Sequence, residues 1–370
     1  MLTIKSRTHD YMVESFESLK AAFCGIDRAR AYYLIDNAVA CHYRSVITDY
    51  TEASRTVLVE ATEENKSLEN LAPVFIELLK RGLKRDGVLV VIGGGVLQDI
   101  GCFIASVLSR GLRWELIPTT LLAQADSCIG SKSSINIGAY KNQIGTFYPP
   151  HRVLLTPEVL TTLPPDEIRS GLGEVIKLQL LKSQSDFDEL MADLSRLDQF
   201  NQAAILTKWI ARSMAVKLPY IETDEYDRGV RNLLNYGHTF GHAYESATHY
   251  SIPHGIAVIL GMLTATFLSA RLQLVPERHY LELKQKLSPW HQPYGAALYS
   301  ADRSVIFQAI KHDKKNIGEV VNCILTRGPG AMEKMCVDFV GQLQPAVNQF
   351  IDKELNVCIS NNALTITPAI

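Results

Sequence analysis

The stretch DGVLVVIGGGVLQDIGCFIASVLSRG, residues 86–111, decides the fold that we expect for this chain. Residues 86–92 form a short apolar run, which predicts a buried strand. Three glycines at 93–95 follow, and an apolar segment of helical length comes next. Glycines between a strand and a helix let backbone N–H groups approach a phosphate at the positive helix end. Because this is not the GxGxxG fingerprint, both a nucleotide-binding turn and a plain tight turn stay open.

Flanking segments repeat the order of strand, polar turn and helix. Residues 29–39 predict a buried strand that ends at Asp36, and residues 56–61 predict another. An amphipathic helix within residues 62–83 should follow, with Thr62 or Glu63 as its cap. A short strand near Trp114 and a final strand in HRVLL complete the series. This alternation predicts an α/β domain that binds ligands at the carboxyl ends of its strands.

The pattern of the sequence changes from alternating strands and helices to long helices after the double proline at residues 164 and 165. Long helical patterns cover residues 166–181, 200–221 and 254–274. One β-like piece covers residues 319–328, and we expect the remainder to be helical up to the C-terminal tail. We therefore predict an α/β domain over residues 1–164 and a mainly α-helical domain over residues 165–370.

Composition narrows the range of partners. The chain has 370 residues, 47% hydrophobic content and a formal charge of −2, so neither nucleic acid nor an anionic membrane is an expected partner. Small anions remain possible. Its seven cysteines include no CxxC pair, which is typical of reduced thiols in a cytosolic protein. We find no apolar leader and no uninterrupted apolar run of membrane length, and we expect a cytoplasmic protein.

A second informative stretch is RNLLNYGHTFGHAYESATHYSIPHG, residues 231–255. His238 and His242 stand four residues apart, so both project from one face of a helix, and His254 follows. The best-placed carboxylate is Glu174 in GLGEVIK, with Lys177 one turn further on. Two imidazoles and one carboxylate make an open zinc site. Paired histidines on an ordinary helix are the alternative.

Several motifs in a shared order give the chain a family resemblance from about Asp36 to Gly330. They are EENKSLE, GGGVLQD, RGLRWELIPTTLLAQADS, YKNQIGTFYPP, LTTLP, GEVIK, DEYDRGVRNLLNYGHTFGH, HG and DKK. Together they resemble the 3-dehydroquinate synthase family and, more widely, the sugar-phosphate cyclases. The resemblance implies an N-terminal Rossmann-like domain that binds NAD, a C-terminal helical domain that binds metal and substrate, a Zn²⁺ or Co²⁺ ion, and a homodimer.

Residue roles follow from the same resemblance. Metal ligands would be Glu174, His238 and His254, which moves His242 to a catalytic role. Other catalytic roles would fall on Glu174, Lys177 and Asn235. The NAD contacts would be Asp36, Glu63, Lys66, Gly94, Gly95, Val96, Asp99, Thr119, Thr120, Asp126, Lys132, Lys141 and Thr162. Substrate contacts would be Arg110 from a neighbouring subunit, Lys132, Asn142, Lys217, Arg231 and Lys314.

The implied reaction converts 3-deoxy-arabino-heptulosonate 7-phosphate into 3-dehydroquinate and phosphate, a lyase step of the shikimate pathway. NAD takes a hydride, phosphate leaves, the hydride returns, and the product closes to a carbocycle. Lys217 and Arg231 match the pair that holds the substrate carboxylate.

Two departures keep alternatives open. GSKSSINIGAY replaces the usual glycine pair, and Ile256 stands where the family has an acidic residue. They favour another sugar-phosphate cyclase, one that uses an amino-dehydroquinate precursor or a heptulose phosphate. A metal-dependent alcohol dehydrogenase is a more distant alternative.

Overall fold

The computed structural model describes residues 1–138, 140–197, 202–311, 320–355, 358–360 and 363–365. The chain divides into two compact units. The first holds Met1–Ile168 with Asn201–Asp227, and the second holds Arg169–Phe200 with Arg228–Ile370. Helix α8 (Gln202–Thr223) therefore groups with the N-terminal segment, although it follows residue 165 in the chain. The domain boundary at residues 164 and 165 stays a prediction.

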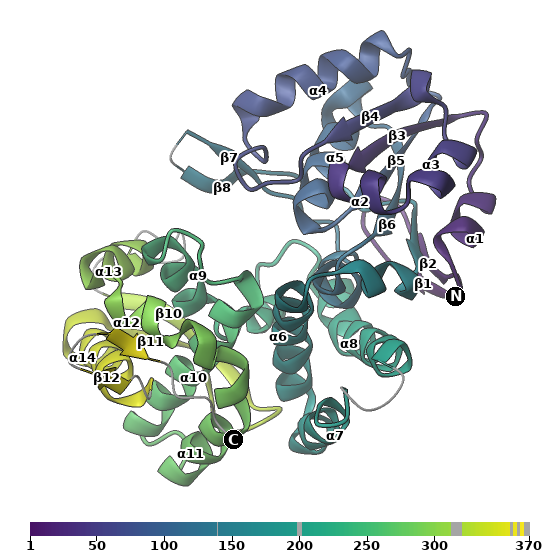
Figure 1. Cartoon of the computed structure of the whole chain (residues 1–370). Helices are drawn as coiled ribbons and strands as arrows, with labels where there is room; N and C mark the ends of the chain where they lie inside the picture. Colours follow the sequence, from purple (N-terminus) through teal and green to yellow (C-terminus); the bar gives the residue numbers. More distant parts are fainter. Residues whose placement is uncertain (139, 198–201, 312–319, 356–357, 361–362, 366–370) are drawn as a thin grey trace. The chain divides into compact units, whose positions relative to one another are not determined.

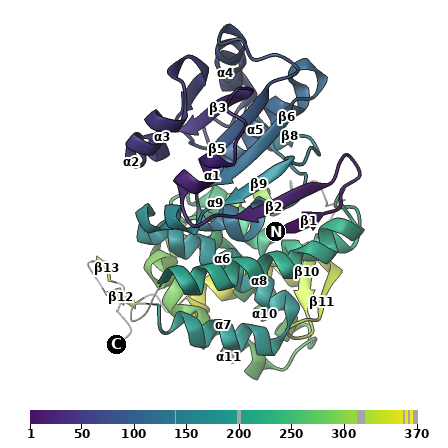
Figure 2. The same cartoon turned by 90° about the vertical axis from the view of Figure 1, so that its right-hand side faces the viewer.

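A sheet of seven strands forms the middle of the first unit in the part of the chain that is described, in the order β1-β2-β9-β6-β5-β3-β4 (Figures 1 and 2). Neighbours from β2 to β4 are parallel, and β1 is antiparallel to β2. The strands are β1 (Leu2–Ile4), β2 (Tyr11–Ser15), β3 (Ala31–Asp36), β4 (Thr56–Val59), β5 (Val88–Gly93), β6 (Arg113–Pro118) and β9 (Arg152–Leu155). A hairpin of β7 (Ile135–Ile137) and β8 (Tyr140–Ile144) lies apart from this sheet in the hydrogen-bonding pattern.

Helices cover both faces of the sheet because its central strand is apolar on both sides. Every residue of β5 is buried. Val90 joins a core cluster with residues of α1 and α3, while Val91 meets Gly101 of α5 so closely that an added Cβ would lie 2.4 Å from Val91 Cγ2. Successive side chains of a strand point to opposite faces. The helices of this unit are α1 (Leu19–Cys24), α2 (Asn37–His42), α3 (Arg44–Tyr50), α4 (Leu68–Lys80), α5 (Gly95–Val107) and α8.

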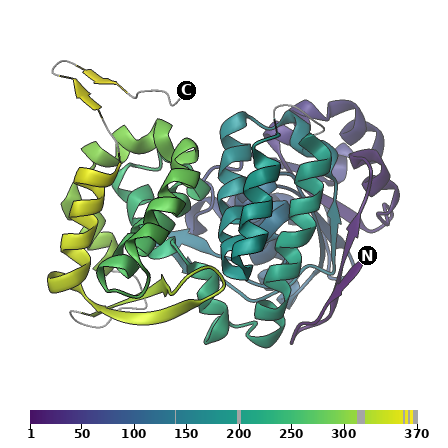
Figure 3. The same cartoon turned by 90° about the horizontal axis from the view of Figure 1, so that it is seen from below.

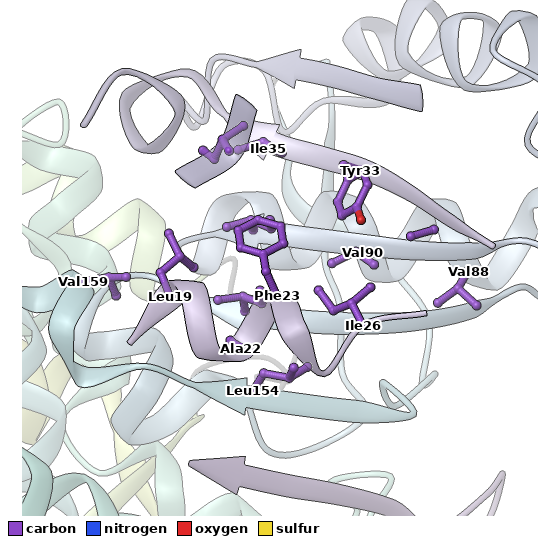
Figure 4. Close-up of a cluster of buried hydrophobic side chains, with 14 residues drawn as sticks. Leu19, Ala22, Phe23, Ile26, Tyr33, Ile35, Val88, Val90, Leu154 and Val159 are labelled. Atoms are coloured by element: carbon purple, nitrogen blue, oxygen red, sulfur yellow. The ribbon is translucent and has the colours of Figure 1, made fainter. Parts of the chain in front are cut away.

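The core cluster on one face of the sheet starts from a simple pattern in α1. Leu19, Ala22, Phe23 and Ile26 recur at helical spacing and point toward Val90 and its neighbours (Figure 4). Leu19, Ala22 and Phe23 are fully buried. Apolar residues at this spacing form one stripe, which must be covered to stabilise the helix. The stripe fixes α1 over strands β3, β5 and β9.

The strands predicted at residues 29–39, 56–61 and 86–92 are confirmed as β3, β4 and β5. The predicted start of the next helix is wrong. Helix α4 begins at Leu68 after Ser67, not after Thr62 or Glu63. Thr62 instead closes a tight turn, because its carbonyl oxygen accepts from the backbone N–H of Asn65. A capping pattern is ambiguous where a turn uses the same polar residues.

The second unit is built around helix α10 (His254–Arg271), which packs against α9, α11, α14 and β10. In Figure 3 the yellow helix α14 stands beside the green helices of this unit. Other elements are α6 (Pro165–Lys182), α7 (Gln184–Leu194), α9 (His238–Ala247), α11 (Glu277–His291), α12 (Gly295–Ser300), α13 (Arg303–Lys311), β10 (Val320–Thr326), β11 (Met332–Asp338), α14 (Gln344–Gln349), β12 (Cys358–Ser360) and β13 (Ala363–Thr365).

Helix α10 is long and apolar enough to cross a membrane by length and composition alone. However, 83% of it is buried inside the protein, and every residue from Gly255 to Ser269 is buried. A helix that is apolar all round and covered all round is a core helix. We interpret α10 as the core helix of the second unit.

The expectation of a helical remainder after the β-like piece is wrong at one place. Strand β10 pairs with β11 in an antiparallel ribbon that runs from Val320↔Asp338 to Thr326↔Met332. The sequence of β11, MEKMCVD, has exposed and half-buried positions and only one buried residue. An apolar pattern is therefore almost absent from β11, and the pairing with β10 determines its conformation.

A stacked pair of histidines makes the stability of the first unit sensitive to acid. The rings of His9 and His151 lie 3.9 Å apart between centroids. Burial lowers the pKa of both, and the neighbouring His9 and Arg113 help to bring that of His151 to about 4. An unfolded histidine titrates near 6.5, so the unfolded chain binds more protons between these two values. This contribution to stability is present above pH 6.5 and is lost as the pH falls toward 4.

We expect the urea midpoint of the wild-type protein to fall between pH 6.5 and pH 4, and to fall less in His151→Gln, because that side chain does not titrate. Urea unfolding at half-unit pH steps checks this. His42→Gln, at an exposed histidine of α2, is the control and should follow the wild type. An unchanged pH dependence in His151→Gln would assign the acid sensitivity to other groups.

Candidate active site

The predicted cofactor residues of the first unit gather at one edge of its sheet. Strands β3, β5 and β6 end at Asp36, Gly93 and Pro118, and the chain after each end carries predicted residues. Carboxyl ends of parallel strands meet at the same edge, which is where open α/β sheets bind ligands. Predicted cofactor residues lie at or beyond the carboxyl ends of β3, β4, β5, β6 and β9. They are Asp36, Glu63, Lys66, Gly94, Gly95, Val96, Asp99, Thr119, Thr120, Asp126 and Thr162.

The glycine turn has the geometry of a phosphate cradle. A Cβ added at Gly94 would lie 2.7 Å from Thr120 Cγ2, so only glycine fits there beside the loop that follows β6. Helix α5 begins at Gly95, and within the described residues no side chain caps it. Backbone N–H groups at an uncapped helix start suit an anion. The turn therefore fits the pyrophosphate of a dinucleotide better than a plain tight turn.

Lys66 is the centre of a polar network beside this turn. Its buried ammonium lies 3.2 Å from Asp99 Oδ2, 3.3 Å from Glu63 Oε1 and 3.1 Å from Asn142 Oδ1. Burial alone would lower the pKa of Lys66, but Asp99 and Glu63 raise it above its usual value. Burial raises the pKa of Asp99. The network brings three predicted cofactor residues together with one predicted phosphate contact.

Ser134 joins the same network and was not predicted. Its hydroxyl lies 3.0 Å from Asp99 Oδ2 and 2.9 Å from Asn142 Oδ1, and its backbone N–H donates to Asp99 at 3.3 Å. Asn142 has φ +56°, the left-handed region that asparagine tolerates better than most residues. The signal was the GSKSSINIGAY departure itself, since Ser134 lies within that stretch. The departure thus places a hydroxyl between the helix α5 and the β7–β8 hairpin.

Three further predicted lysines lie beside carboxylates within the first unit. Lys132 pairs with Asp227, a residue that sequence reasoning missed although DEYDRGV was quoted as a motif. Lys217 on α8 is buried, donates to the backbone oxygen of Asp126 at 2.6 Å and forms an ion pair with its Oδ1 at 2.7 Å. Lys141 lies 3.6 Å from Glu63 Oε1. These contacts fix the ammonium groups before any ligand arrives.

The second unit brings together the predicted metal ligands. Glu174 of α6 is 1% exposed, and its Oε1 lies 3.4 Å from His238 Nε2 and 3.2 Å from His254 Nε2. Its Oε2 contacts the buried Lys177 ammonium. His242, one turn after His238 on α9, has a ring nitrogen within 4.8 Å of the ligand atoms of the other two histidines.

Close helix packing places these side chains. A Cβ added at Gly255 would lie 1.7 Å from the carbonyl oxygen of Ser170, so α10 touches α6 one turn before Glu174. A Cβ added at Gly241 would lie 2.9 Å from the carbonyl oxygen of Ala257, so α9 touches α10 as well. Glycines at such crossings allow backbones to approach where any side chain would separate them. The three ligand-bearing helices are therefore fixed against one another.

Electrostatics at this centre are dominated by burial and by Lys177. Burial would raise the pKa of the Glu174 carboxyl, but Lys177 and His238 hold it well below its usual range. Burial and Lys177 lower the pKa of His238. Burial also disfavours protonated His254, yet its contacts with Glu174 and Glu245 raise its pKa to about 10. Glu174 is thus an anion across the physiological range, as a metal ligand must be.

The donor set fits a divalent metal ion. Both oxygens of Glu174 are buried, and neither has a hydrogen bond of acceptable geometry within the described residues. Two imidazole Nε2 atoms converge on one of these oxygens instead. A bound cation would satisfy the buried oxygen and both lone pairs, and two histidines with one carboxylate leave a position open for a further ligand. His254 remains 32% exposed and His242 is exposed, so a small molecule can reach this position.

The remaining predicted residues lie as follows. Arg231 and Asn235 belong to the short helix Val230–Asn235 that precedes α9, and Arg231 is buried. Arg110 follows α5 with φ +63°. Lys314 lies outside the described residues.

Comparisons with known proteins agree with this arrangement. Residues 56–170 match the family model described as 3-dehydroquinate synthase N-terminal, and residues 171–316 match 3-dehydroquinate synthase C-terminal. The chain is 34% identical over 346 residues to a 3-dehydroquinate synthase of Koribacter versatilis (strain Ellin345), covering 90% of this chain and 92% of the relative.

Two solved structures share the fold. A 2-deoxy-scyllo-inosose synthase complexed with carbaglucose-6-phosphate, NAD⁺ and Co²⁺ is 21% identical, with a TM-score of 0.79 over 94% of this chain and 99% of that one. The 2-epi-5-epi-valiolone synthase ValA of Streptomyces hygroscopicus subsp. jinggangensis 5008, with NAD⁺ and Zn²⁺ bound, is 23% identical, with a TM-score of 0.77 over 96% and 99%. Both expected units of the fold, α/β and mainly helical, are confirmed.

The metal ligands can be tested directly. We expect His238→Ala and His254→Ala each to lose stoichiometric Zn²⁺ while keeping the helical circular-dichroism spectrum, because each removes one ligand from a partly exposed position. Glu174→Ala should also lose the metal, but should destabilise the protein by about 3 to 5 kcal/mol, because Lys177 would be buried without its anion. Metal analysis after dialysis, together with urea unfolding, measures both effects.

His249→Asn is the matched control, since His249 is exposed and has φ +50°, which asparagine accepts. It should retain the metal fully. Stoichiometric Zn²⁺ in both histidine variants would place the metal elsewhere.

Proposed function

Because this chain belongs to the 3-dehydroquinate synthase family, we propose that it converts 3-deoxy-arabino-heptulosonate 7-phosphate into 3-dehydroquinate and phosphate. The observation that carries the proposal is the convergence of His238 and His254 on the buried Glu174 carboxylate. A lyase reaction of this kind needs an electrophile that polarises a carbon–oxygen group. The test is phosphate release from the heptulosonate phosphate with catalytic NAD and Zn²⁺.

Glu174, His238 and His254 would hold the divalent metal, Zn²⁺ or Co²⁺, which when bound supplies a Lewis acid for the substrate oxygen. His242 borders this position from the exposed side, where it can move a proton to or from the substrate. Lys177 keeps Glu174 ionised and therefore able to act as a ligand. Asn235, just before α9, would contact the sugar hydroxyls.

The first unit would hold NAD, which when bound supplies a hydride acceptor that is restored within each turnover. Gly94, Gly95 and Val96 would cradle its pyrophosphate at the start of α5. Asp36 lies at the end of β3, where ribose hydroxyls are bound in doubly wound folds. Glu63, Lys66, Asp99, Thr119, Thr120, Asp126, Lys132, Lys141 and Thr162 complete the proposed cofactor contacts.

Cationic side chains would hold the anionic ends of the substrate. Lys132, Asn142 and Lys314 would bind its phosphate, and Lys217 and Arg231 its carboxylate. Lys217 and Arg231 are both buried. A buried guanidinium favours an anion over a neutral hydroxyl, since charge-assisted contacts are the strong ones in a water-poor site. This favours the acid sugar over a neutral one.

The proposal extends to the organisation of the protein. Residues 1–164 would form the NAD-binding domain and residues 165–370 the metal- and substrate-binding domain. We propose a cytoplasmic homodimer in which Arg110 contacts the substrate phosphate of the neighbouring subunit.

One alternative has specific support. The GSKSSINIGAY stretch and Ile256 depart from the pattern that the resemblance implies, and Ser134 of that stretch contacts Asn142, a proposed phosphate contact. A cyclase for a heptulose phosphate or an amino-dehydroquinate precursor would keep the metal and the NAD but change the sugar. Phosphate release from each sugar distinguishes these cyclases, while net NADH formation without phosphate release would indicate an alcohol dehydrogenase.

The glycine turn gives a test of cofactor binding. We expect Gly94→Val to weaken NAD binding about 10- to 100-fold, because its Cβ must displace Thr120 at a cost of about 1 to 3 kcal/mol. Titration calorimetry with NAD measures the affinity. Gly95→Ala separates the two causes, because its Cβ would have no protein atom closer than 3.8 Å. It should leave the urea midpoint unchanged and still weaken NAD, and unchanged NAD affinity in both folded variants would contradict the assignment.

Arg231 gives a test of substrate choice. We expect Arg231→Ala to lose about 2 to 4 kcal/mol of transition-state stabilisation with heptulosonate phosphate, because the substrate carboxylate loses a charged partner. The wild type should prefer this substrate strongly over sedoheptulose 7-phosphate. Values of kcat/KM for phosphate release check both statements, with Arg228→Ala, at an exposed neighbour, as the control. Equal turnover of the neutral sugar by the wild type would move the chain to another cyclase branch.

A further inference from the structure

His254 has a carboxylate at each of its two ring nitrogens. Its Nε2 lies 3.2 Å from Glu174 Oε1, and its Nδ1 lies 3.2 Å from Glu245 Oε2. Glu245 belongs to α9 and is 5% exposed. Nothing in the sequence pattern assigned a role to Glu245. Its position behind a metal-facing imidazole calls for a physical explanation.

The contact at Nδ1 determines which nitrogen can bind a metal. A neutral imidazole carries one proton, and the nitrogen without it offers the lone pair. An ionised carboxylate only accepts hydrogen bonds, so Glu245 requires the proton on Nδ1. A metal ion that binds here displaces the proton between Nε2 and Glu174, so the lone pair of the bound His254 lies on Nε2. Partners of this kind fix the tautomer and ring orientation of metal-binding histidines and raise their basicity.

His238 shows the same arrangement with a weaker partner. Its Nε2 faces Glu174, and its Nδ1 lies 3.3 Å from the backbone carbonyl oxygen of Tyr236. Both imidazoles are therefore held from behind with Nε2 directed at one oxygen. The carbonyl carries a partial charge, whereas the carboxylate of Glu245 carries a full one. His254 is thus the more strongly polarised ligand of the two.

The local charge balance gives Glu245 a second effect. A divalent ion beside Glu174 would share this buried region with the Lys177 ammonium, which contacts Glu174 Oε2. Glu245 adds a second negative charge behind His254. A buried charge without compensation is costly, so the second carboxylate lowers the cost of placing the ion there.

Helix geometry explains how Glu245 reaches this place. His238, His242 and Glu245 stand at positions i, i+4 and i+7 of α9, so one face of one helix carries two imidazoles and the carboxylate. Helix α10 packs along α9, and His254 at its start lies beside His238 and His242. Ile256, two residues after His254, is fully buried and carries no charge.

We propose that Glu245 is a positioning residue for the metal site, which holds the Nδ1 proton of His254, directs its Nε2 lone pair at the ion and supplies a negative charge behind that imidazole. The inference rests on the proposed function only in that a divalent ion must bind at Glu174, His238 and His254.

The test measures metal affinity without substrate. We compare the wild type, Glu245→Gln and Glu277→Gln, whose glutamate is exposed in the first turn of α11. Zn²⁺ affinity is determined by competition with a chromophoric chelator, and Co²⁺ binding is followed by its visible absorption. Glu245→Gln should bind both ions about 10- to 100-fold more weakly, as expected for loss of the partner behind a metal-bound histidine. Glu277→Gln should match the wild type.

Glu245→Asp guards against a purely structural effect. It keeps the charge in a shorter side chain, so it should bind metal more tightly than Glu245→Gln if charge is what matters, whereas a packing role predicts equal or greater loss because more volume is removed. Metal affinity of Glu245→Gln within twofold of the wild type overturns the proposal, and so does an aspartate variant no better than the glutamine variant. A wild type that binds neither ion refutes the metal site itself and with it the proposed function.

Discussion

The structure of the second unit depends on keeping the buried carboxylate of Glu174 ionised. Burial disfavours the ionised form of this carboxyl. The Lys177 ammonium on the same helix offsets that effect by its contact with one of the two carboxylate oxygens. The other oxygen faces two imidazole nitrogens from α9 and α10. A charge in this position is tolerated only when every neighbour is fixed, because an error in geometry leaves it uncompensated. The glycine crossings of α6, α9 and α10 provide that fixed geometry.

The first unit differs from the second, because the protein groups proposed to bind its ligand come from the backbone as much as from side chains. Helices cover both faces of a parallel sheet, so only its edges are exposed. The carboxyl ends of its strands lie at one edge, and the loops that follow these ends therefore lie close together. Gly94 illustrates the constraint, because Thr120 occupies the space that a side chain would need. Lys66 and its carboxylate partners then tie the loop after β4 to helix α5.

Periodicity and spacing were enough to predict the strands β3, β4 and β5 and the helical second unit, whereas the grouping of Glu174 with His238 and His254 came from the family resemblance. They failed where a tertiary contact decided the outcome. Strand β11 has almost no apolar pattern and takes its conformation from β10. Helix α4 starts late because Thr62 closes a turn. Glu245 escaped notice because its partner, His254, lies on another helix.

The departure at Ser134 shows why a substitution in a polar loop cannot be interpreted from sequence alone. Its hydroxyl lies within hydrogen-bonding distance of two acceptors, Asp99 Oδ2 and Asn142 Oδ1, but it has one proton to donate. Lys66 already donates to both of these acceptors. The hydroxyl proton therefore satisfies one acceptor at a time, and an anion that draws Lys66 away would change which one. A side chain without a hydroxyl could not make these contacts, so Ser134 connects helix α5, which follows the glycine turn, to the β7–β8 hairpin.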